Sequence, residues 1–197
     1  MANKRSRPPA AESIQLAAPA PLSLADELFR RRKLQTIFIS SEMGSGALLR
    51  TRRVAAEAVR RTRIAEPWLW EESVHAGPYI SEETCVTQAA NSQGLVLIID
   101  RVITPITRKE YRAARANGVP VYVMAMARRS RPPEIERFLK RERKHVIYKE
   151  PRNHSELATH VEEAIIYYTN EAVWRRQDEL RRSAIEAAKK TTRTRKS

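Results

Sequence analysis

The sequence predicts an α/β fold in which five parallel strands form one sheet with helices on both faces. Two observations lead to this prediction. Short apolar runs alternate with helical patterns five times along the 197 residues, and this alternation is typical of a parallel sheet built from βαβ units. The run from Gly94 to Asp100 is apolar without interruption, which fits a strand that is buried on both faces.

The chain before the first strand divides into two segments. Residues 1–22 are rich in alanine, proline and basic residues, so we expect a disordered tail. Residues 23–33 have an N-cap serine, early acids and late bases, which predicts a short helix. The folded domain is therefore expected to span residues 23–174.

The first β-α-β unit follows this helix. Residues 34–41 are the expected first strand, and residues 42–46 form a flexible loop. Residues 47–63 predict a helix with its arginines turned outward. Leu48, Val54 and Ala58, with Leu49 as a further candidate, are its expected inward positions. Residues 64–71 predict a second strand, which Pro67 restricts to the edge of the sheet because proline has no amide hydrogen to donate.

The central βαβ unit comes next. Residues 80–92 predict a helix that Ser81 caps and in which Cys85 is a small buried residue. After the strand at 94–100, the polar segment Thr104–Thr107 breaks the chain. Thr107 is the expected cap of a helix whose third residue is Glu110.

The unit is completed by an expected strand over residues 119–126, after Gly118 has ended the helix. Two parallel strands joined by a helix form a right-handed crossover. The carboxyl end of this unit is therefore the place to look for a ligand site.

The last third of the chain predicts a helix, a short strand and a long helix. Residues 132–142 form the first helix, with Ile135, Phe138 and Leu139 on one face. Residues 144–149 are the fifth strand, and Asn153 or Ser155 caps the final helix. The apolar positions of that helix recur at intervals of three and four residues: Leu157, Val161, Ala164, Ile165, Tyr168 and Ala172. Residues 175–197 are expected to form a basic helical extension.

Taken together, these elements predict a flavodoxin-like three-layer sandwich with strand order 2-1-3-4-5. In such a sheet the strand order reverses between the first and third strands, and ligands bind beyond the carboxyl ends of the strands there. The loop at 40–46 and the loop at 100–107 would therefore flank one cleft.

Charge and composition limit the kinds of protein to which this chain can belong. The formal net charge is +14, and residues 1–33 and 175–197 carry about +4 and +6 of it. A solubilising role is the simplest explanation of these basic ends, and contact with nucleic acid or an acidic partner is the alternative. No apolar run is long enough to span a bilayer, and no secretory signal is recognisable. A single cysteine excludes an internal disulfide. A cytoplasmic location is therefore expected.

Glu110 is the strongest candidate for chemistry at the predicted cleft. A carboxylate there could stabilise the positive charge that develops on a ribosyl ring when an N-glycosidic bond breaks, or attack the ring directly. The competing interpretation is a capping box in which Glu110 lies three residues after Thr107.

Other side chains at the same edge are candidates for substrate binding. Ser40 and Ser41 could hold a phosphate or a ribose, although a plain strand-to-helix connection is the simpler interpretation. Arg53 could reach an anion, or it could lie on a solvated helix face. Glu71 could bind a ribose hydroxyl. Asp100 and Tyr111 are further candidates, because they belong to the segment that borders the predicted cleft. The histidines do not have the spacing of metal ligands, so we expect no metal and no bound cofactor.

Two sequence strings resemble a known family. They are IFISS at residues 37–41 and ITRKEYRAARANGVPVYV at 106–123. The strings and their spacing resemble the TIR-like domain of unknown function that heads many NTPase signalling proteins, within the wider TIR and nucleoside deoxyribosyltransferase group. The resemblance covers about residues 34–170. It implies that the glutamate at position 110 is catalytic.

The resemblance implies an N-glycosidase that cleaves NAD or a related nucleotide, as a prokaryotic immune or signalling effector that assembly activates. NAD would then be a substrate rather than a cofactor. The partners would be further copies of the chain, or another protein such as an NTPase or a nucleotide sensor. The alternative function is a non-catalytic module that assembles with a partner. The bulky residues Arg101, Val102 and Ile103 lie in the loop that would admit a nucleotide.

Overall fold

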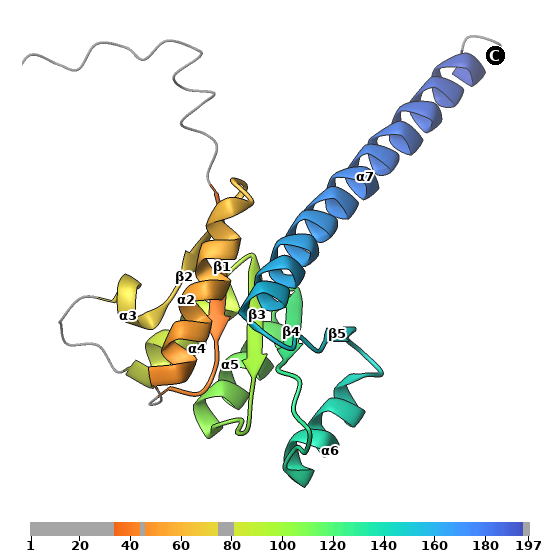
Figure 1. The fold of residues 1–197 in the computed structure, drawn as a ribbon. Helices are drawn as coiled ribbons and strands as arrows, with labels where there is room; N and C mark the ends of the chain where they lie inside the picture. The colour runs from red at the N-terminus through yellow and green to blue at the C-terminus, as the bar shows by residue number, and fades with distance from the viewer. Residues whose placement is uncertain (1–33, 44–45, 75–80, 195–197) are drawn as a thin grey trace, which may run out of the picture. The chain divides into compact units, whose positions relative to one another are not determined.

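The structure is a computed structural model that describes residues 34–43, 46–74 and 81–194. The predicted tail at 1–22 and helix at 23–33 lie outside this part of the chain. The strands are β1 (Gln35–Ser40), β2 (Ala65–Trp68), β3 (Gly94–Ile99), β4 (Val121–Ala125) and β5 (Tyr148–Lys149). They form one parallel sheet in the order β2-β1-β3-β4-β5 (Figure 1). This confirms the predicted topology.

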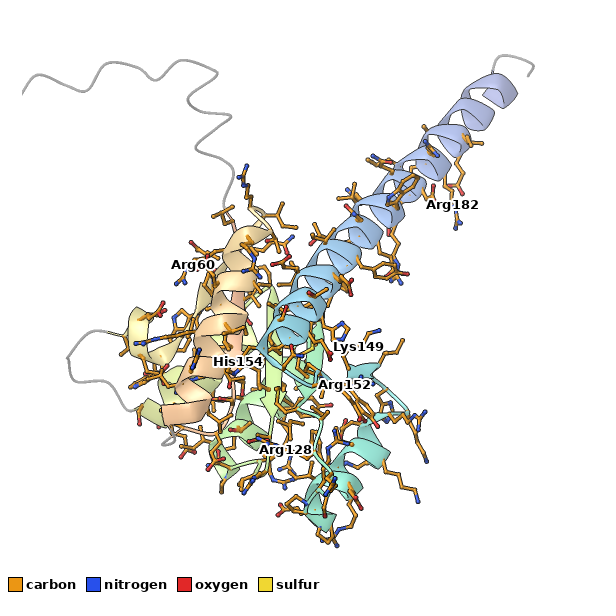
Figure 2. The ribbon with its side chains drawn as sticks, viewed as in Figure 1. Arg60, Arg128, Lys149, Arg152, His154 and Arg182 are labelled. Carbon is orange, nitrogen blue, oxygen red and sulfur yellow. The ribbon has the colours of Figure 1, made fainter. Side chains whose placement is uncertain are left out.

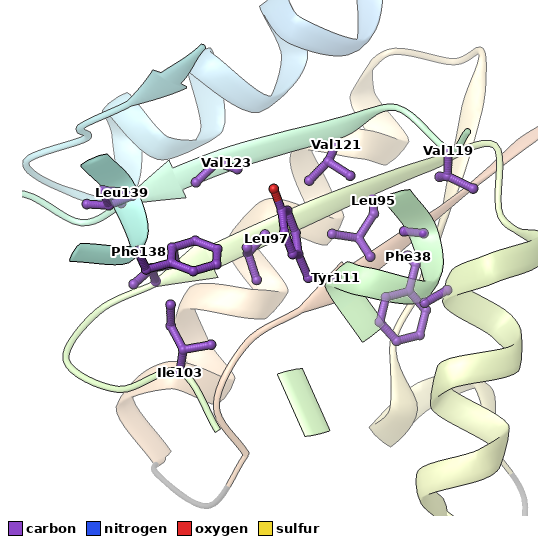
Figure 3. Packing of buried hydrophobic residues seen from close by; sticks show 14 of the residues in the cluster. Phe38, Leu95, Leu97, Ile103, Tyr111, Val119, Val121, Val123, Phe138 and Leu139 are labelled. Carbon is purple, nitrogen blue, oxygen red and sulfur yellow. The ribbon is translucent and has the colours of Figure 1, made fainter. Parts of the chain in front are cut away.

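Helices cover both faces of the sheet. The described helices are α2 (Gly46–Arg61), α3 (Trp70–Ser73), α4 (Ser81–Asn91), α5 (Pro105–Ala116), α6 (Pro133–Glu142) and α7 (His154–Thr194). One hydrophobic cluster joins α4, α5 and α6 to one face of the sheet (Figure 3). A second cluster joins α2 and α7 to the other face. The fold is therefore a three-layer sandwich.

Strand β3 is the centre of both clusters. All six of its residues are buried. Leu95 and Leu97 belong to the first cluster and Val96 and Ile98 to the second, because successive side chains of a strand point to opposite faces. The uninterrupted apolar run is explained by this double burial.

Strand β2 is shorter than predicted. It lies at the edge of the sheet, as Pro67 indicated, but it ends at Trp68 and is followed by the short helix α3. The amide of Leu69 donates to Ser73 Oγ over 3.2 Å instead of extending the ladder with β1. Glu71 consequently lies on α3 and not at the end of a strand.

Strand β5 is also shorter than the predicted range of 144–149. The amides of His145 and Val146 both donate to the carbonyl oxygen of Glu142, over 2.8 and 2.9 Å. These bonds continue the turn after α6, and only Tyr148 and Lys149 remain to pair with β4.

Helix α7 begins where the sequence predicted. Asn153 Oδ1 accepts a hydrogen bond of 2.9 Å from the amide of Glu156, which identifies Asn153 as the cap. Leu157, Val161 and Ile165 are fully buried against the sheet and α2. Every described side chain from position 172 to 186 is exposed, so this part of α7 has no packed face within the described chain.

Gly94 begins β3 at a place with no room for a side chain. A Cβ atom there would lie 2.8 Å from Ile37 Cδ1 and 3.1 Å from Tyr122 Cε2. We predict that Gly94→Ala lowers the free energy of unfolding by about 1–3 kcal/mol, because overpacking a close-packed core displaces neighbouring side chains. Denaturant unfolding followed by circular dichroism measures the change.

Gly46→Ala is the matched control. A Cβ at Gly46 meets nothing within 4 Å, so this variant should be neutral or slightly more stable. Equal destabilisation by both substitutions would contradict the packing explanation.

Candidate functional site

The candidate site lies at the carboxyl end of β1. Ser40 ends this strand and Ser41 follows it, and both side chains are buried. Since β1 and β3 are neighbours with their carboxyl ends at the same edge, these hydroxyls occupy the point at which the strand order reverses. Doubly wound sheets bind their ligands at this point.

Glu110 reaches this point from α5. Its side chain is 4% exposed, and Ser40 Oγ donates a hydrogen bond of 2.5 Å to Glu110 Oε2. The predicted capping box is wrong: Thr104 caps α5 and accepts from the amide of Thr107 over 3.2 Å. Pro105 fits the first helical position, so the helix begins earlier than predicted and Glu110 lies in its second turn, facing inward.

Arg52 connects three segments around the site. It is 4% exposed, and its Nη1 atom donates to Ser41 Oγ over 3.0 Å and to the carbonyl oxygen of Glu42 over 2.7 Å. Its Nη2 atom forms a hydrogen-bonded ion pair with Glu71. The buried Nε atom of Arg52 has no hydrogen-bond partner among the described residues.

Burial shifts the pKa values of Glu110 and Cys85. Desolvation raises the pKa of Glu110, while the hydrogen bonds from Ser40 and Cys85 and the charge of Arg52 oppose the rise. Burial is also the first cause that raises the pKa of the Cys85 thiol to about 12, and the nearby Glu110 carboxylate adds to it. The two groups therefore both favour their protonated forms.

Aromatic rings form one wall of the cavity beside these groups. Phe38 and Trp68 stack with ring centroids 4.9 Å apart, and Trp70 meets Trp68 edge-on at 6.5 Å. The cavity is also lined by Met43. Its volume is about 10 Å³, which is room for about one water molecule.

Four of the predicted site residues meet at this cavity. Ser40, Ser41, Glu71 and Glu110 all line it, together with Arg52. Three other candidates lie elsewhere. They are Arg53, Asp100 and Tyr111, and each has a different partner.

Arg53 points away from the cavity. Its side chain is 62% exposed and lies 3.9 Å from a carboxylate oxygen of Glu72. The expectation that all arginines of this helix face outward was wrong for its neighbour Arg52. The sequence held only a partial signal: position 52 is four residues after Leu48, on the stripe that the structure buries together with Ala55 and Ala56.

Asp100 and Tyr111 are engaged in other contacts. Both carboxylate oxygens of Asp100 accept from Arg128, over 2.5 and 2.7 Å. Tyr111 packs in the first cluster against Phe138 (Figure 3). Its hydroxyl donates to Glu142. In this structure neither residue lines the cavity.

The bulky loop residues after β3 leave the cavity unobstructed. Ile103 is buried in the first cluster, and Val102 is 47% exposed. Neither residue lines the cavity, so the loop does not plug it. The cavity is small because the aromatic rings, Met43 and Arg52 close around Glu110.

The described residues contain neither a metal site nor a membrane-spanning helix. Within the described ranges, no group of three or more histidine, cysteine, aspartate or glutamate side chains is arranged to hold a metal ion. None of the helices in this same part of the chain is both long and apolar enough to cross a bilayer. Basic side chains are spread over several elements, including Arg60 on α2, Arg128 after β4 and Arg182 on α7 (Figure 2).

The raised pKa of Glu110 predicts how stability depends on pH. The folded carboxyl keeps its proton at pH values where the unfolded one, with an ordinary pKa of 4.5, has lost it. Stability is therefore lost as pH rises from about 4.5 through the folded pKa. We predict that Glu110→Gln is more stable than the natural chain at pH 8, and that the difference shrinks towards pH 4.

Urea unfolding at several pH values measures this difference. The glutamine amide can donate to Ser40 Oγ, so the variant keeps a hydrogen bond at the site. A constant difference between pH 4 and pH 8 would show that the carboxyl titrates normally in the folded state.

The raised pKa of the Cys85 thiol predicts that this residue is alkylated slowly. A thiol with a pKa of about 12 holds about 10³-fold less thiolate near neutral pH than an ordinary cysteine, and thiolate is the reactive form. We predict that iodoacetamide labels the folded chain at least about 100-fold more slowly than the chain unfolded in guanidinium. Equal rates would show that the cavity is open in solution.

Two solved structures are similar to this chain over about two thirds of its length. A conserved protein from Enterococcus faecalis V583 has 16% identity and a TM-score of 0.46, and the similarity covers 66% of this chain and 99% of that one. A flavodoxin-like domain from a Synechococcus species has 11% identity and a TM-score of 0.44, with 68% and 98% covered. No curated protein is significantly similar in sequence.

A family comparison covers most of the chain. The family described as "Domain of unknown function (DUF4062)" matches residues 36–189. This range includes β2 to β5, all of β1 except Gln35, and every residue of the cavity. The chain belongs to the DUF4062 family.

Proposed function

We propose that this protein is a TIR-like N-glycosidase that cleaves the bond between base and ribose in NAD or a related nucleotide. Glu110 is the proposed catalytic carboxylate. One observation carries the proposal: a buried glutamate is held by Ser40 at the carboxyl end of β1, where doubly wound sheets bind ligands. The sequence resemblance to TIR-like domains, in which the matching glutamate is catalytic, supports the same role.

The proposed reaction uses a single carboxylate. In NAD the nicotinamide ring carries a positive charge and leaves as a neutral molecule with the electron pair of the C1′–N bond. The positive charge passes to the ribosyl ring, where Glu110 stabilises it or bonds to C1′. Water then adds at C1′ and releases a proton, giving ADP-ribose and nicotinamide. A cationic leaving group needs no general acid, which fits a site with one buried carboxyl.

The raised pKa of Glu110 is compatible with this role. An opposite charge within about 4–6 Å lowers the pKa of a carboxyl by about 1–3 units. The nicotinamide cation would therefore lower the pKa of Glu110 as it binds and favour the carboxylate form. In the empty site the raised pKa favours the protonated form, which limits the cost of burying the carboxyl.

The neighbouring side chains suggest how a nucleotide would be held. Glu71 uses Oε1 for its ion pair with Arg52, and its other oxygen could accept from a ribose hydroxyl. The Nε atom of Arg52, which has no hydrogen-bond partner in the described part of the chain, supplies a donor for a substrate oxygen. Trp68 and Trp70 offer aromatic faces beside these groups, and bases stack on such faces.

The small volume of the cavity suggests how the proposed enzyme would be activated. Ligand pockets usually enclose about 300–1,000 Å³, whereas this cavity has about 10 Å³. We therefore propose that the site must widen before it accepts a nucleotide, and that assembly with further copies or with a partner such as an NTPase or a nucleotide sensor provides the trigger. An immune or signalling effector would have this kind of control.

A second candidate function is a non-catalytic assembly module. The closed cavity is the observation that favours it, because a buried Ser40–Glu110 pair can also serve only to specify the packing of α5 on the sheet. The two functions differ in one measurable respect, which is the release of a free base.

We predict that the concentrated protein releases nicotinamide from NAD, and that Glu110→Gln lowers this rate by about 10²–10³-fold, the usual cost of losing one electrostatic group at a reacting centre. Chromatography of the products from NAD and from nucleosides measures release. Glu83→Gln, an exposed position on α4, is the matched control and should retain full activity.

Two outcomes would overturn the proposal. Unchanged release by the Glu110→Gln variant removes this carboxylate from the mechanism. No release from any substrate at any protein concentration favours the assembly module. Urea unfolding of the Glu110→Gln variant at neutral pH separates a loss of activity from a loss of folding.

A further inference from the structure

Helix α7 is much longer than the sheet it covers. It has 41 residues, which corresponds to about 60 Å at 1.5 Å per residue. The last buried residue in its described part is Ile165. Most of the stability of helices in proteins comes from packing of an amphipathic face, so a partner is expected to cover part of this extension.

Apolar side chains follow one side of this extension. Ile166, Val173 and Leu180 are seven residues apart and are 44%, 50% and 55% exposed. Tyr167 and Trp174, which are also seven residues apart, lie beside them and are 71% and 66% exposed. We call these five residues, together with Ala184 and Ile185, the α7 stripe.

Most of the remaining circumference of the extension is charged, with Tyr168 and Ala172 as apolar exceptions. Ion pairs within the helix join Arg175 to Glu171 at 2.7 Å and Arg176 to Glu179 at 3.0 Å. Most of the charged positions lie away from the stripe at 100° per residue. The extension is therefore amphipathic, and its apolar side has no partner among the described residues.

We propose that the α7 stripe pairs with the same stripe of a second copy of this chain, forming a two-stranded coiled coil. A spacing of seven residues, rather than the average pattern of a globular helix, is the repeat that keeps a seam facing a partner helix. Ile166, Val173 and Leu180 supply one position of each heptad, and Asn170, Gln177 and Ala184 the other. A polar residue at such a position fixes the register of a coiled coil.

The available area is sufficient for a dimer. The exposed parts of the large stripe residues provide on the order of 700 Å² per copy, close to the roughly 800 Å² per partner of a standard interface. Two aromatic residues contribute much of this area, and aromatic residues are enriched at the centres of interfaces.

Charge distinguishes a second copy from other occupants. Residues 166–186 hold four arginines and four acidic residues, so the segment that carries the stripe is neutral, and the basic excess of the C-terminal part lies after it, in residues 187–197. A helix that lies on an anionic membrane or along nucleic acid carries an excess of basic residues. A neutral amphipathic helix with a heptad repeat fits a partner helix of the same kind. The inference does not depend on the proposed enzymatic activity.

Sedimentation and light scattering of the full chain test this inference. We expect a concentration-dependent dimer, and we expect Val173→Glu and Leu180→Glu each to raise its dissociation constant at least about tenfold. Both positions are exposed, so the monomer should remain folded, as thermal unfolding followed by circular dichroism will verify. Ala172→Glu, on the other side of the exposed helix, is the matched control and should leave the dimer intact.

Three results would overturn the inference. The first is a natural chain that stays monomeric at every concentration. The second is a dimer that resists both substitutions in the stripe. The third is equal weakening by the Ala172→Glu control, which would indicate a general effect of added charge. None of these results depends on whether NAD is cleaved.

Discussion

The hydrogen bond between Ser40 and Glu110 is the contact on which the carboxyl edge of the sheet depends. It joins the end of β1 to the helix that crosses from β3 to β4, and both groups are buried. A buried carboxyl without a partner would cost several kcal/mol. The pairing, the Cys85 thiol and the proximity of Arg52 reduce this cost, and they also fix the direction in which the carboxyl points. The same contacts therefore affect both the orientation of the Glu110 carboxyl and its pKa.

Much of the fold could be predicted from the sequence because its strands differ in burial. The strand at 94–99 is apolar throughout and became the centre of the sheet, while Pro67 identified the edge. The errors occurred where one contact outweighed a local pattern. Thr104 and Pro105 started α5 earlier than Thr107 suggested, and the bond from Leu69 to Ser73 replaced the end of the second strand with α3.

The site was only partly predictable for a related reason. Ser40, Ser41 and Glu110 follow from topology, because the ends of neighbouring parallel strands must meet. Arg52 does not, since an arginine on a helix is usually solvated. Its burial depends on two groups from other segments, Ser41 and Glu71, and their positions become known only once α2 and α3 are placed. Arg53, one residue later, lies on the solvated side of the same helix.

Polar contacts at two points hold α2 to α7. Thr51 Oγ1 lies 3.0 Å from His154 Nε2 at the start of α7, and Arg61 pairs with Glu162 further along. These contacts clamp the two helices at two separate points, and Arg52 is the residue next to Thr51. Helix α2, which carries Arg52 at the cavity, is thus tied to the same helix that bears the exposed stripe.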